Sequence, residues 1–266
     1  LLGATAGRTT LAGEGLQHQD GHSHVLALPV PNLIAYDPAF ADELAVIIRD
    51  GIRRMYAEEE SVFYYITVGN ENYPMLAMPE GSEQGILRGM YKLRASTQKK
   101  LKIKATLLGS GSILNEALKA QDLLAEKFGV AADVWSVTSY KELHKNIVDV
   151  ARWNMLNPGE KPRESYVEQC LKNEAGPIVA ASDYLKLLPD SLSRAIPQRL
   201  VSLGTNGFGR SESRKALRDF FEVDARWIAF ATLHGLFLDG KIKEDIVKQA
   251  MQTLEIDPNK LNPMNS

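Results

Sequence analysis

Residues 13–24, which read GEGLQHQDGHSH, form the densest group of side chains in the sequence that could transfer protons or bind ions. Three of the five histidines of the chain fall within this segment, together with two carboxylates. Its glycines allow backbone conformations closed to other residues and let a ligand approach closely. The residues concerned are Glu14, His18, Asp20, His22 and His24.

Three interpretations of this loop are open. A metal site could use the spacing His18-x3-His22-x-His24, but no CxxC or HExxH frame supports it, and the glycines disfavour the helix that such a pair needs. A hydrogen-bonded surface or subunit-contact loop is a second interpretation. The third, which we favour, is an active-site loop in which one histidine, titrating near neutrality, handles protons or stabilises developing charge.

A second candidate is the glycine turn in LLGSGSILNEAL, residues 107–118, where a strand, a turn and a helix resemble a dinucleotide-binding fingerprint. Leu114 stands where the third glycine is expected, and no acidic residue closes a ribose site at the end of the next strand. A tight turn that leads into an ordinary crossover helix explains the pattern equally well, so nicotinamide binding stays a minor alternative.

A third candidate is Gly204–Arg214, in GTNGFGRSESR, where glycines and two arginines follow a strand and precede a helix that Ser211 is expected to cap. The arginines, Arg210 and Arg214, could bind an anion at the start of that helix. Plain architecture, with Phe208 filling a domain contact, is equally compatible with the pattern.

The elements that position these loops alternate between strand and helix. Strands separated by crossover helices pair in parallel, which predicts an open, mostly parallel three-layer α/β/α sheet preceded by the tail of a second α/β domain. Asp37 and Pro38 are expected to begin the first long helix, and residues 69–89 to be irregular. We expect strands at 32–36, 61–68, 102–109, 132–138, 177–182 and 199–204, and helices at 38–55, 112–128, 140–155, 164–173, 184–195, 211–220, 225–238 and 244–254.

Composition narrows the class of protein. The chain has 266 residues and a net charge of −2, which gives no electrostatic reason to expect a nucleic-acid or anionic-membrane partner. No apolar run approaches the roughly 18 residues of a membrane span. A single cysteine, Cys170, fits a reducing compartment, so we expect a cytoplasmic protein. The opening LLGATAGRTT has neither an initiator methionine nor signal-peptide order, which suggests a piece of a longer protein.

Several motifs, spread in order over nearly the whole chain, resemble the thiamine-diphosphate enzymes of the transketolase superfamily, and most closely the last third of the homodimeric bacterial pyruvate dehydrogenase first component. Transketolase itself is less similar in the histidine loop. The motifs are TTLAGEGLQHQDGHSH (9–24), IAYDPAFADELAVI (34–47), NENYPMLAMPEG (70–81), LLGSGSIL (107–114), RWNML (152–156) and LGTNGFGRSESR (203–214).

The resemblance implies a domain plan. Residues 1–68 correspond to the tail of the pyrimidine-binding middle domain, 69–100 to a connector, and 101–266 to a transketolase-like C-terminal domain that binds no nucleotide. The glutamate that activates the aminopyrimidine ring and the segment that holds magnesium and diphosphate are absent, so the cofactor ligands are expected upstream. We therefore expect the fragment alone to be inactive, and much of residues 1–24 to be mobile because packing partners are missing.

The resemblance also implies an activity. Such enzymes decarboxylate pyruvate on thiamine diphosphate with Mg²⁺ and pass the acetyl unit to the lipoyl group of the dihydrolipoyl acetyltransferase, working as homodimers. His18 is implied to be catalytic and to reach the cofactor, with Glu14 in the same catalytic loop; no metal ligand is implied in this piece. A non-catalytic dimerisation or partner-docking module is the alternative from another class of function.

Overall fold

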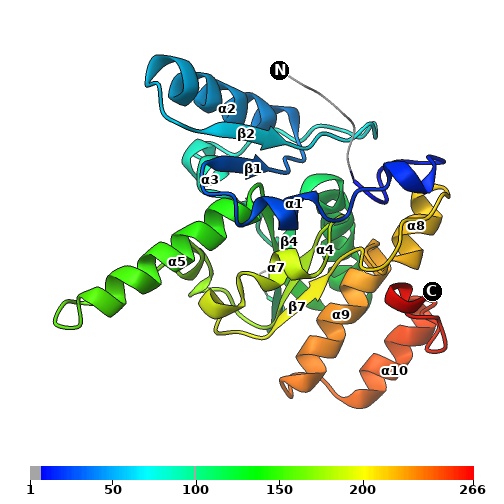
Figure 1. Ribbon diagram of the computed structural model, residues 1–266. Helices are drawn as coiled ribbons and strands as arrows, with labels where there is room; N and C mark the ends of the chain where they lie inside the picture. Colours follow the sequence, from blue (N-terminus) through cyan, green and yellow to red (C-terminus); the bar gives the residue numbers. More distant parts are fainter. Residues whose placement is uncertain (1–6, 99) are drawn as a thin grey trace.

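The computed structural model describes residues 7–98 and 100–266, which form a small α/β unit and a larger one (Figure 1). Residues 1–6 of the expected N-terminal loop, and residue 99 of the expected connector, lie outside the described part of the chain. No helix of the described residues is both long and apolar enough to cross a lipid bilayer.

The small unit is a two-stranded parallel sheet, in which β1 (Leu33–Tyr36) pairs with β2 (Phe63–Ile66). The connection between them is α2 (Ala41–Ile52), extended by a π-helical turn, Arg53–Ala57. The expected helix start at Asp37 and Pro38 is wrong, because the Asp37 carboxylate is buried against Thr67 instead of capping a helix.

At the start of α2, Glu43 accepts hydrogen bonds from backbone N–H groups that have no partner within the helix. Its carboxylate accepts hydrogen bonds from the N–H groups of Ala39 (2.6 Å) and Phe40 (3.1 Å). The same carboxylate accepts the hydroxyl groups of Tyr91 (2.8 Å) and Ser136 (2.5 Å), which belong to the larger unit. One fully buried acid therefore caps α2 and ties the two units together.

The larger unit is built on a five-stranded sheet of order β3-β5-β4-β6-β7. Neighbouring strands are parallel except for β3, which runs antiparallel to β5. The predicted open, mostly parallel sheet is confirmed. The strands are β3 (Met90–Arg94), β4 (Ile103–Gly109), β5 (Val130–Val137), β6 (Ile178–Ala181) and β7 (Leu200–Leu203).

The predicted connector, residues 69–100, contains two elements that the sequence analysis missed, one of them within the stretch 69–89 that was expected to be irregular. The helix α3 (Glu83–Arg88) ends at Gly89, whose φ of 108° is a left-handed conformation that glycine adopts without strain. The chain then enters β3 directly. β3 has only five residues, and its pairing with β5 was not visible from its own sequence.

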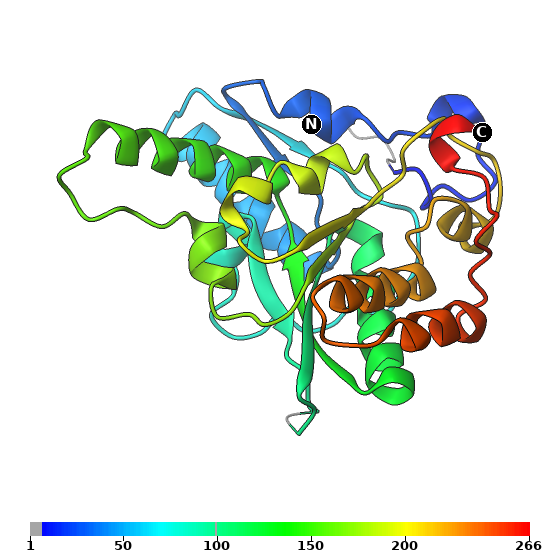
Figure 2. The same cartoon turned by 90° about the horizontal axis from the view of Figure 1, so that it is seen from below.

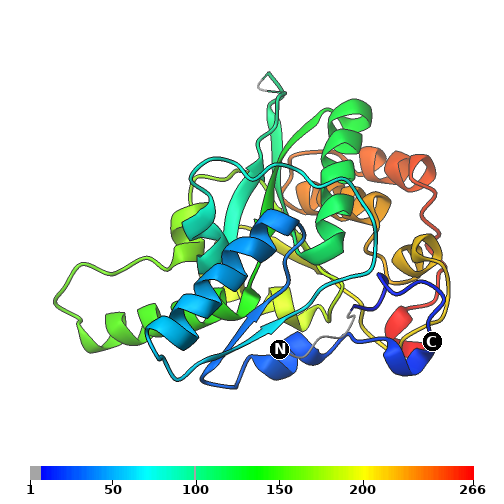
Figure 3. The ribbon, with the colours of Figure 1, turned by 90° about the horizontal axis from the view of Figure 1, so that it is seen from above.

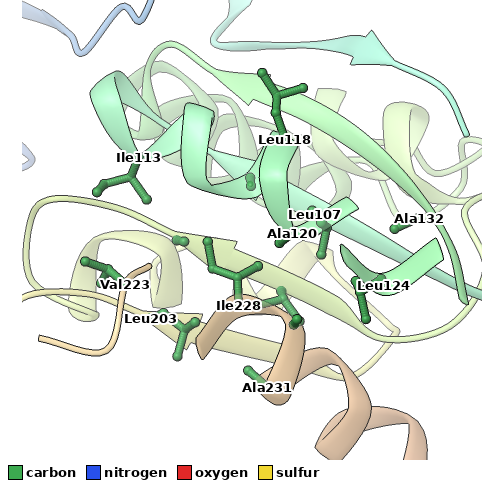
Figure 4. Close-up of a cluster of buried hydrophobic side chains, with 14 of the residues drawn as sticks. Leu107, Ile113, Leu118, Ala120, Leu124, Ala132, Leu203, Val223, Ile228 and Ala231 are labelled. Atoms are coloured by element: carbon green, nitrogen blue, oxygen red, sulfur yellow. The ribbon is translucent and has the colours of Figure 1, made fainter. Parts of the chain in front are cut away.

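Helices cover both faces of this sheet. Successive strand residues point to opposite sides, and apolar residues on both sides pack against helices. Leu107 packs with residues of α4 (Leu114–Phe128) and α9 (Ala225–Leu238), including Leu124 and Ile228 (Figure 4). Its neighbour Leu108 packs instead with the cluster under α5 (Tyr140–Leu156). Figure 2 shows α5 on one side of the sheet and α9 on the other, which is the predicted three-layer arrangement.

Of the remaining helices, α6 (Tyr166–Leu171) and α10 (Glu244–Thr253) form within one or two residues of their predicted bounds, and two others differ more. Only Leu187–Asp190 (α7) and the 3-10 turn Ser193–Ala195 form within the predicted helix 184–195, since Pro189 would clash with the carbonyl group four residues earlier in a longer helix. Helix α8 (Arg214–Phe220) is capped by Ser213, and not by Ser211 as expected. The others are α1 (Ser23–Ala27) and the 3-10 turns Leu16–His18, Gly111–Ile113 and Pro263–Asn265.

Candidate active-site loop

The loop that carries His18 is a short 3-10 turn, Leu16–His18, held at the surface. The N–H of His18 donates to the carbonyl of Gly15 (3.0 Å), and the imidazole is exposed to solvent. Glu14 lies half-buried on the same loop. In the described part of the chain, no hydrogen bond joins Glu14 to His18, so the imidazole is free to meet a group that approaches from outside.

The three histidines of this segment lie in three different environments. His22 is exposed, and its Nδ1 lies 3.3 Å from Nη2 of Arg8. His24 is buried, with its Nε2 3.0 Å from Oγ1 of Thr67 and its ring edge-on to Tyr184. Residues 7–98 and 100–266 contain no group of three or more acidic, histidine or cysteine side chains arranged to hold a metal ion. The spacing that suggested a metal site does not bring the imidazoles together.

His24 belongs to a buried polar chain that reaches a small cavity. Oγ1 of Thr67 contacts His24 and donates to Oδ1 of Asp37 at 2.7 Å. Burial lowers the pKa of His24 to about 4 and raises the pKa of Asp37 to about 7. The other Asp37 oxygen, Oδ2, has no hydrogen-bond partner in the described structure. The cavity beside it is also lined by Thr10, Gly111, Ser112, Tyr73 and Asp183.

The residues before the loop are buried in the larger unit. Thr9 is fully buried and Arg8 nearly so, and the Arg8 guanidinium donates to the carbonyl groups of Thr205 (2.6 Å) and Gly207 (2.5 Å). Burial lowers the pKa of Arg8, against the opposing effects of Asp183 and Asp20. The reason for expecting mobility here is therefore wrong for residues 8–11, because their packing partners lie within this chain.

The arginines of α8 hold neighbouring segments together. Arg214 donates through Nε to the carbonyl of Thr10 (2.8 Å) and through Nη2 to Asn70 (3.1 Å). Arg218, which is nearly buried, pairs with Glu71 and Glu116. The segment after β2 thus reaches α8 before it returns to the sheet, as Figure 3 shows.

The structure revises the reading of Gly204–Arg214 as an anion site. The Arg214 guanidinium is engaged by the chain itself, and Arg210 lies over the ring of Phe220. The idea that Phe208 fills a contact within the chain is wrong, because its side chain is 80% exposed.

The glycine turn after β4 is architectural. A Cβ on Gly109 would lie 2.7 Å from the Cα of Leu114, and a Cβ on Gly111 would lie 2.7 Å from Oδ2 of Asp37. The N–H of Gly111 donates to the carbonyl of Asp37 (3.1 Å). Gly109 therefore lets the turn pack closely against α4, and Gly111 lets it pack against the small unit, where a dinucleotide would need its phosphates to lie. This geometry speaks against the nicotinamide alternative.

Sequence reasoning did not identify Arg8, Asp37, Thr67 or Asp183 as site residues, and it considered Asp37 only as the start of a helix. A signal for two of them was available, since Asp37 and Asp183 come just after predicted strands, at the carboxyl ends where parallel sheets place their polar sites. No local pattern marked Arg8 or Thr67, whose partners are far away in the sequence.

Comparison with known proteins places the chain in a family. Residues 89–224 match the family described as "Transketolase-like TK C-terminal domain". The chain belongs to that family. Residues 1–75 match a second family, described as "Pyruvate dehydrogenase E1 component middle domain". The two matches follow one another along the chain.

Whole-chain relatives agree with the family matches. The pyruvate dehydrogenase E1 component of Pseudomonas aeruginosa is 52% identical over 266 residues, which is 100% of this chain and 30% of the relative. That of Escherichia coli K12 is 51% identical over 265 residues, 99% of this chain and 29% of the relative. The predicted resemblance to the C-terminal third of the pyruvate dehydrogenase first component is confirmed. The chain spans about 30% of the length of these relatives.

Solved structures agree on the fold. A transketolase mutant from Pichia stipitis matches with a TM-score of 0.64 and 21% identity, over 90% of this chain and 30% of that one. A transketolase from Campylobacter jejuni matches with a TM-score of 0.55 and 18% identity, over 89% and 30%. At these identities the likeness supports the α/β fold and nothing finer.

Proposed function

We propose that this chain is the C-terminal part of an enzyme that oxidatively decarboxylates pyruvate on thiamine diphosphate and acetylates the lipoyl group of a dihydrolipoyl acetyltransferase. The observation that carries the proposal is the identity of about 50% with pyruvate dehydrogenase E1 components, in alignments that span nearly the whole chain. The working enzyme, in this proposal, is a cytoplasmic homodimer that meets the lipoyl domain as its second substrate.

His18 is proposed as the catalytic side chain of this piece. Its imidazole is exposed at the tip of a loop whose two sides are held by the body of the protein. An imidazole in such a position can hydrogen-bond an oxygen of a bound substrate and move a proton to or from it. Glu14 lies close by in sequence and is proposed to act in the same loop.

The residues of this chain fit only part of a thiamine-diphosphate site. When bound, the cofactor supplies the electron sink that decarboxylation requires. His18 would contact it from the loop. The described residues hold no three-carboxylate or mixed cluster for Mg²⁺. The ligands of Mg²⁺ and of the diphosphate are therefore proposed to come from elsewhere in the complete enzyme.

A hybrid enzyme tests the proposal. This chain would replace the corresponding C-terminal 30% of the Pseudomonas aeruginosa relative. His18→Ala is expected to lower pyruvate-dependent acetylation of a lipoyl domain by about 100-fold or more, the typical contribution of a positioned acid or base. His234→Ala, another exposed histidine, serves as the matched control and should leave the rate unchanged.

Equal rates in the two variants would remove His18 from the active site. A hybrid that folds, binds thiamine diphosphate and yet fails to decarboxylate pyruvate would overturn the assigned reaction. The isolated 266-residue chain is expected to show no turnover.

A further inference from the structure

The crevice at the carboxyl ends of β4 and β6 is the place where an open α/β sheet normally binds a ligand. After β4 the chain crosses to β5 on one side, and after β5 it returns past β4 to β6 on the other side. The connections diverge between β4 and β6, and such a divergence leaves a crevice outside the strand ends. Ser112 follows β4 and Asp183 follows β6 at this position.

In this protein the crevice is occupied by the chain itself. Residues 7–11, here called the strap, lie across it, and Asp183 accepts hydrogen bonds from three successive strap residues. Their backbone N–H groups donate at 2.8 Å (Arg8), 2.9 Å (Thr9) and 3.4 Å (Thr10). The hydroxyl groups of Thr9 (2.5 Å) and Thr10 (3.0 Å) also donate to this carboxylate.

Close packing supports the same reading of the strap. A Cβ on Gly7 would lie 2.5 Å from Oδ2 of Asp183, and Gly7 has a φ of 102°. Oγ1 of Thr10 also lies 2.7 Å from Oγ of Ser112, which joins the strap to the end of β4. Successive N–H groups that converge on an anion form the kind of backbone concavity that elsewhere binds phosphate. Here the anion is a buried side chain.

The strap continues into the histidine loop, and the far side of that loop is held by the same region. The carbonyl of Gly21 accepts from the N–H of Leu185, two residues after Asp183, at 3.0 Å. Nε2 of Gln19 donates to the carbonyl of Leu11, at the end of the strap, at 3.2 Å. The segment that carries His18 therefore spans two ends that are both fixed near Asp183.

We propose that Asp183 is a positioning residue for His18: its carboxylate binds the strap that lies across the crevice, and so anchors the segment from which the histidine loop is presented. The anchoring rests only on the contacts above, whereas its consequence for catalysis rests on the proposed function of His18. A loop that must place an imidazole against a substrate gains from fixed ends, because misplacement by about 1 Å can cost about 100-fold in rate.

Hydrogen exchange in the 266-residue chain tests the anchor. The reporters are the amides of Gly13, His18 and Gln19, which are hydrogen-bonded within or beside the loop. Thr9→Val removes the Thr9 hydroxyl that donates a hydrogen bond to the Asp183 carboxylate. This variant and Asp183→Asn should each speed the exchange of the three reporter amides at least about tenfold, which corresponds to the free energy of one hydrogen bond to a charged group. Thr9→Ser keeps the hydroxyl and should restore the original rates.

Tyr91→Phe is the matched control, because it removes a hydroxyl that donates to another buried carboxylate, that of Glu43, which lies outside the crevice. It should leave the three reporter amides unchanged. Unchanged exchange in both Thr9→Val and Asp183→Asn would overturn the anchor, and so would an equal acceleration in Tyr91→Phe. If Asp183→Asn fails to fold, the Thr9 pair decides alone.

The hybrid enzyme then tests the positioning role. Thr9→Val should lower kcat for acetyl transfer about tenfold with little change in KM for pyruvate, and Thr9→Ser should restore it. Faster exchange without any loss of kcat would overturn the positioning role. A fully active His18→Ala hybrid would instead remove the proposed catalytic role of His18, while the exchange result would still decide the anchor.

Discussion

His24 and Asp37 are buried on either side of Thr67, and their ionisations should affect stability in opposite directions. Burial is the main cause of both pKa changes: His24 falls from 6.5 to about 4, and Asp37 rises from 3.8 to about 7. The two groups are linked through the single Thr67 hydroxyl. We therefore expect the pH dependence of one group to hide that of the other in the unaltered protein.

The magnitudes follow from the two pKa differences. His24 is harder to protonate in the folded state than in the unfolded state. Its neutral form therefore costs no stability above pH 6.5, and the free energy of unfolding falls by about 3 kcal/mol as the pH is lowered to about 4. Asp37 is harder to ionise in the folded state, so stability is greatest below pH 3.8 and about 4 kcal/mol is lost as the pH rises to about 7. Between these limits the two effects offset one another to within about 1 kcal/mol.

Single substitutions should expose each effect. Relative to the unaltered chain, the free energy of unfolding of Asp37→Asn should fall by about 4 kcal/mol when the pH is lowered from 7.5 to 4, because the variant lacks the gain that Asp37 supplies on acidification. That of His24→Gln should rise by about 3 kcal/mol over the same range. Urea unfolding at several pH values, followed by the fluorescence of the three tryptophans, measures both differences.

The control is His234→Gln, which alters an exposed histidine and should follow the unaltered chain at every pH. Parallel curves for Asp37→Asn, His24→Gln and the unaltered chain would show that neither buried group has the displaced pKa inferred here. A change of the opposite sign in either variant would refute the assignment of burial as the dominant cause.

Two further substitutions test the packing that positions the loop. Glu43→Gln should lower the free energy of unfolding by about 3 kcal/mol, because an amide cannot accept hydrogen bonds from all four of the buried donors that face this carboxylate. The control is Glu126→Gln, at an exposed position, which should change the free energy of unfolding by less than about 0.5 kcal/mol. Equal changes for the two variants in urea unfolding would contradict the linking role of Glu43. Gly176→Ala should cost about 3 kcal/mol, because φ is 78° and the new Cβ would lie 1.9 Å from the carbonyl oxygen of Lys104. Gly240→Ala, with a φ of 67° and open space around it, should cost only about 1 kcal/mol, so equal shifts in thermal unfolding would show that the Gly176 contact is unimportant.

Local sequence patterns predicted most of the elements. The helix expected at 225–238 forms over Ala225–Leu238, and the helix expected to end at Gly129 does so with that glycine in a left-handed conformation. These elements are long and periodic, or end at residues with a strong conformational preference, so local information is sufficient. β3 was missed because its five residues become a strand only by pairing with β5.

The histidine loop shows where sequence reasoning stopped. The sequence by itself identified the loop and, through the resemblance of its motifs, the family of the chain. Only the tertiary structure separated the exposed His18 from the buried His24, six positions away, since burial depends on residues such as Thr67 and Tyr184.

The same limit applies to the anchor of the loop. Asp183 meets Arg8 across 175 positions in the sequence. Hydrophobic periodicity and turn chemistry act over a few residues, so they determine which segments become strands and helices. Which carboxylate closes the crevice, and which histidine reaches solvent, is decided when distant segments pack against one another and exclude water from the groups between them.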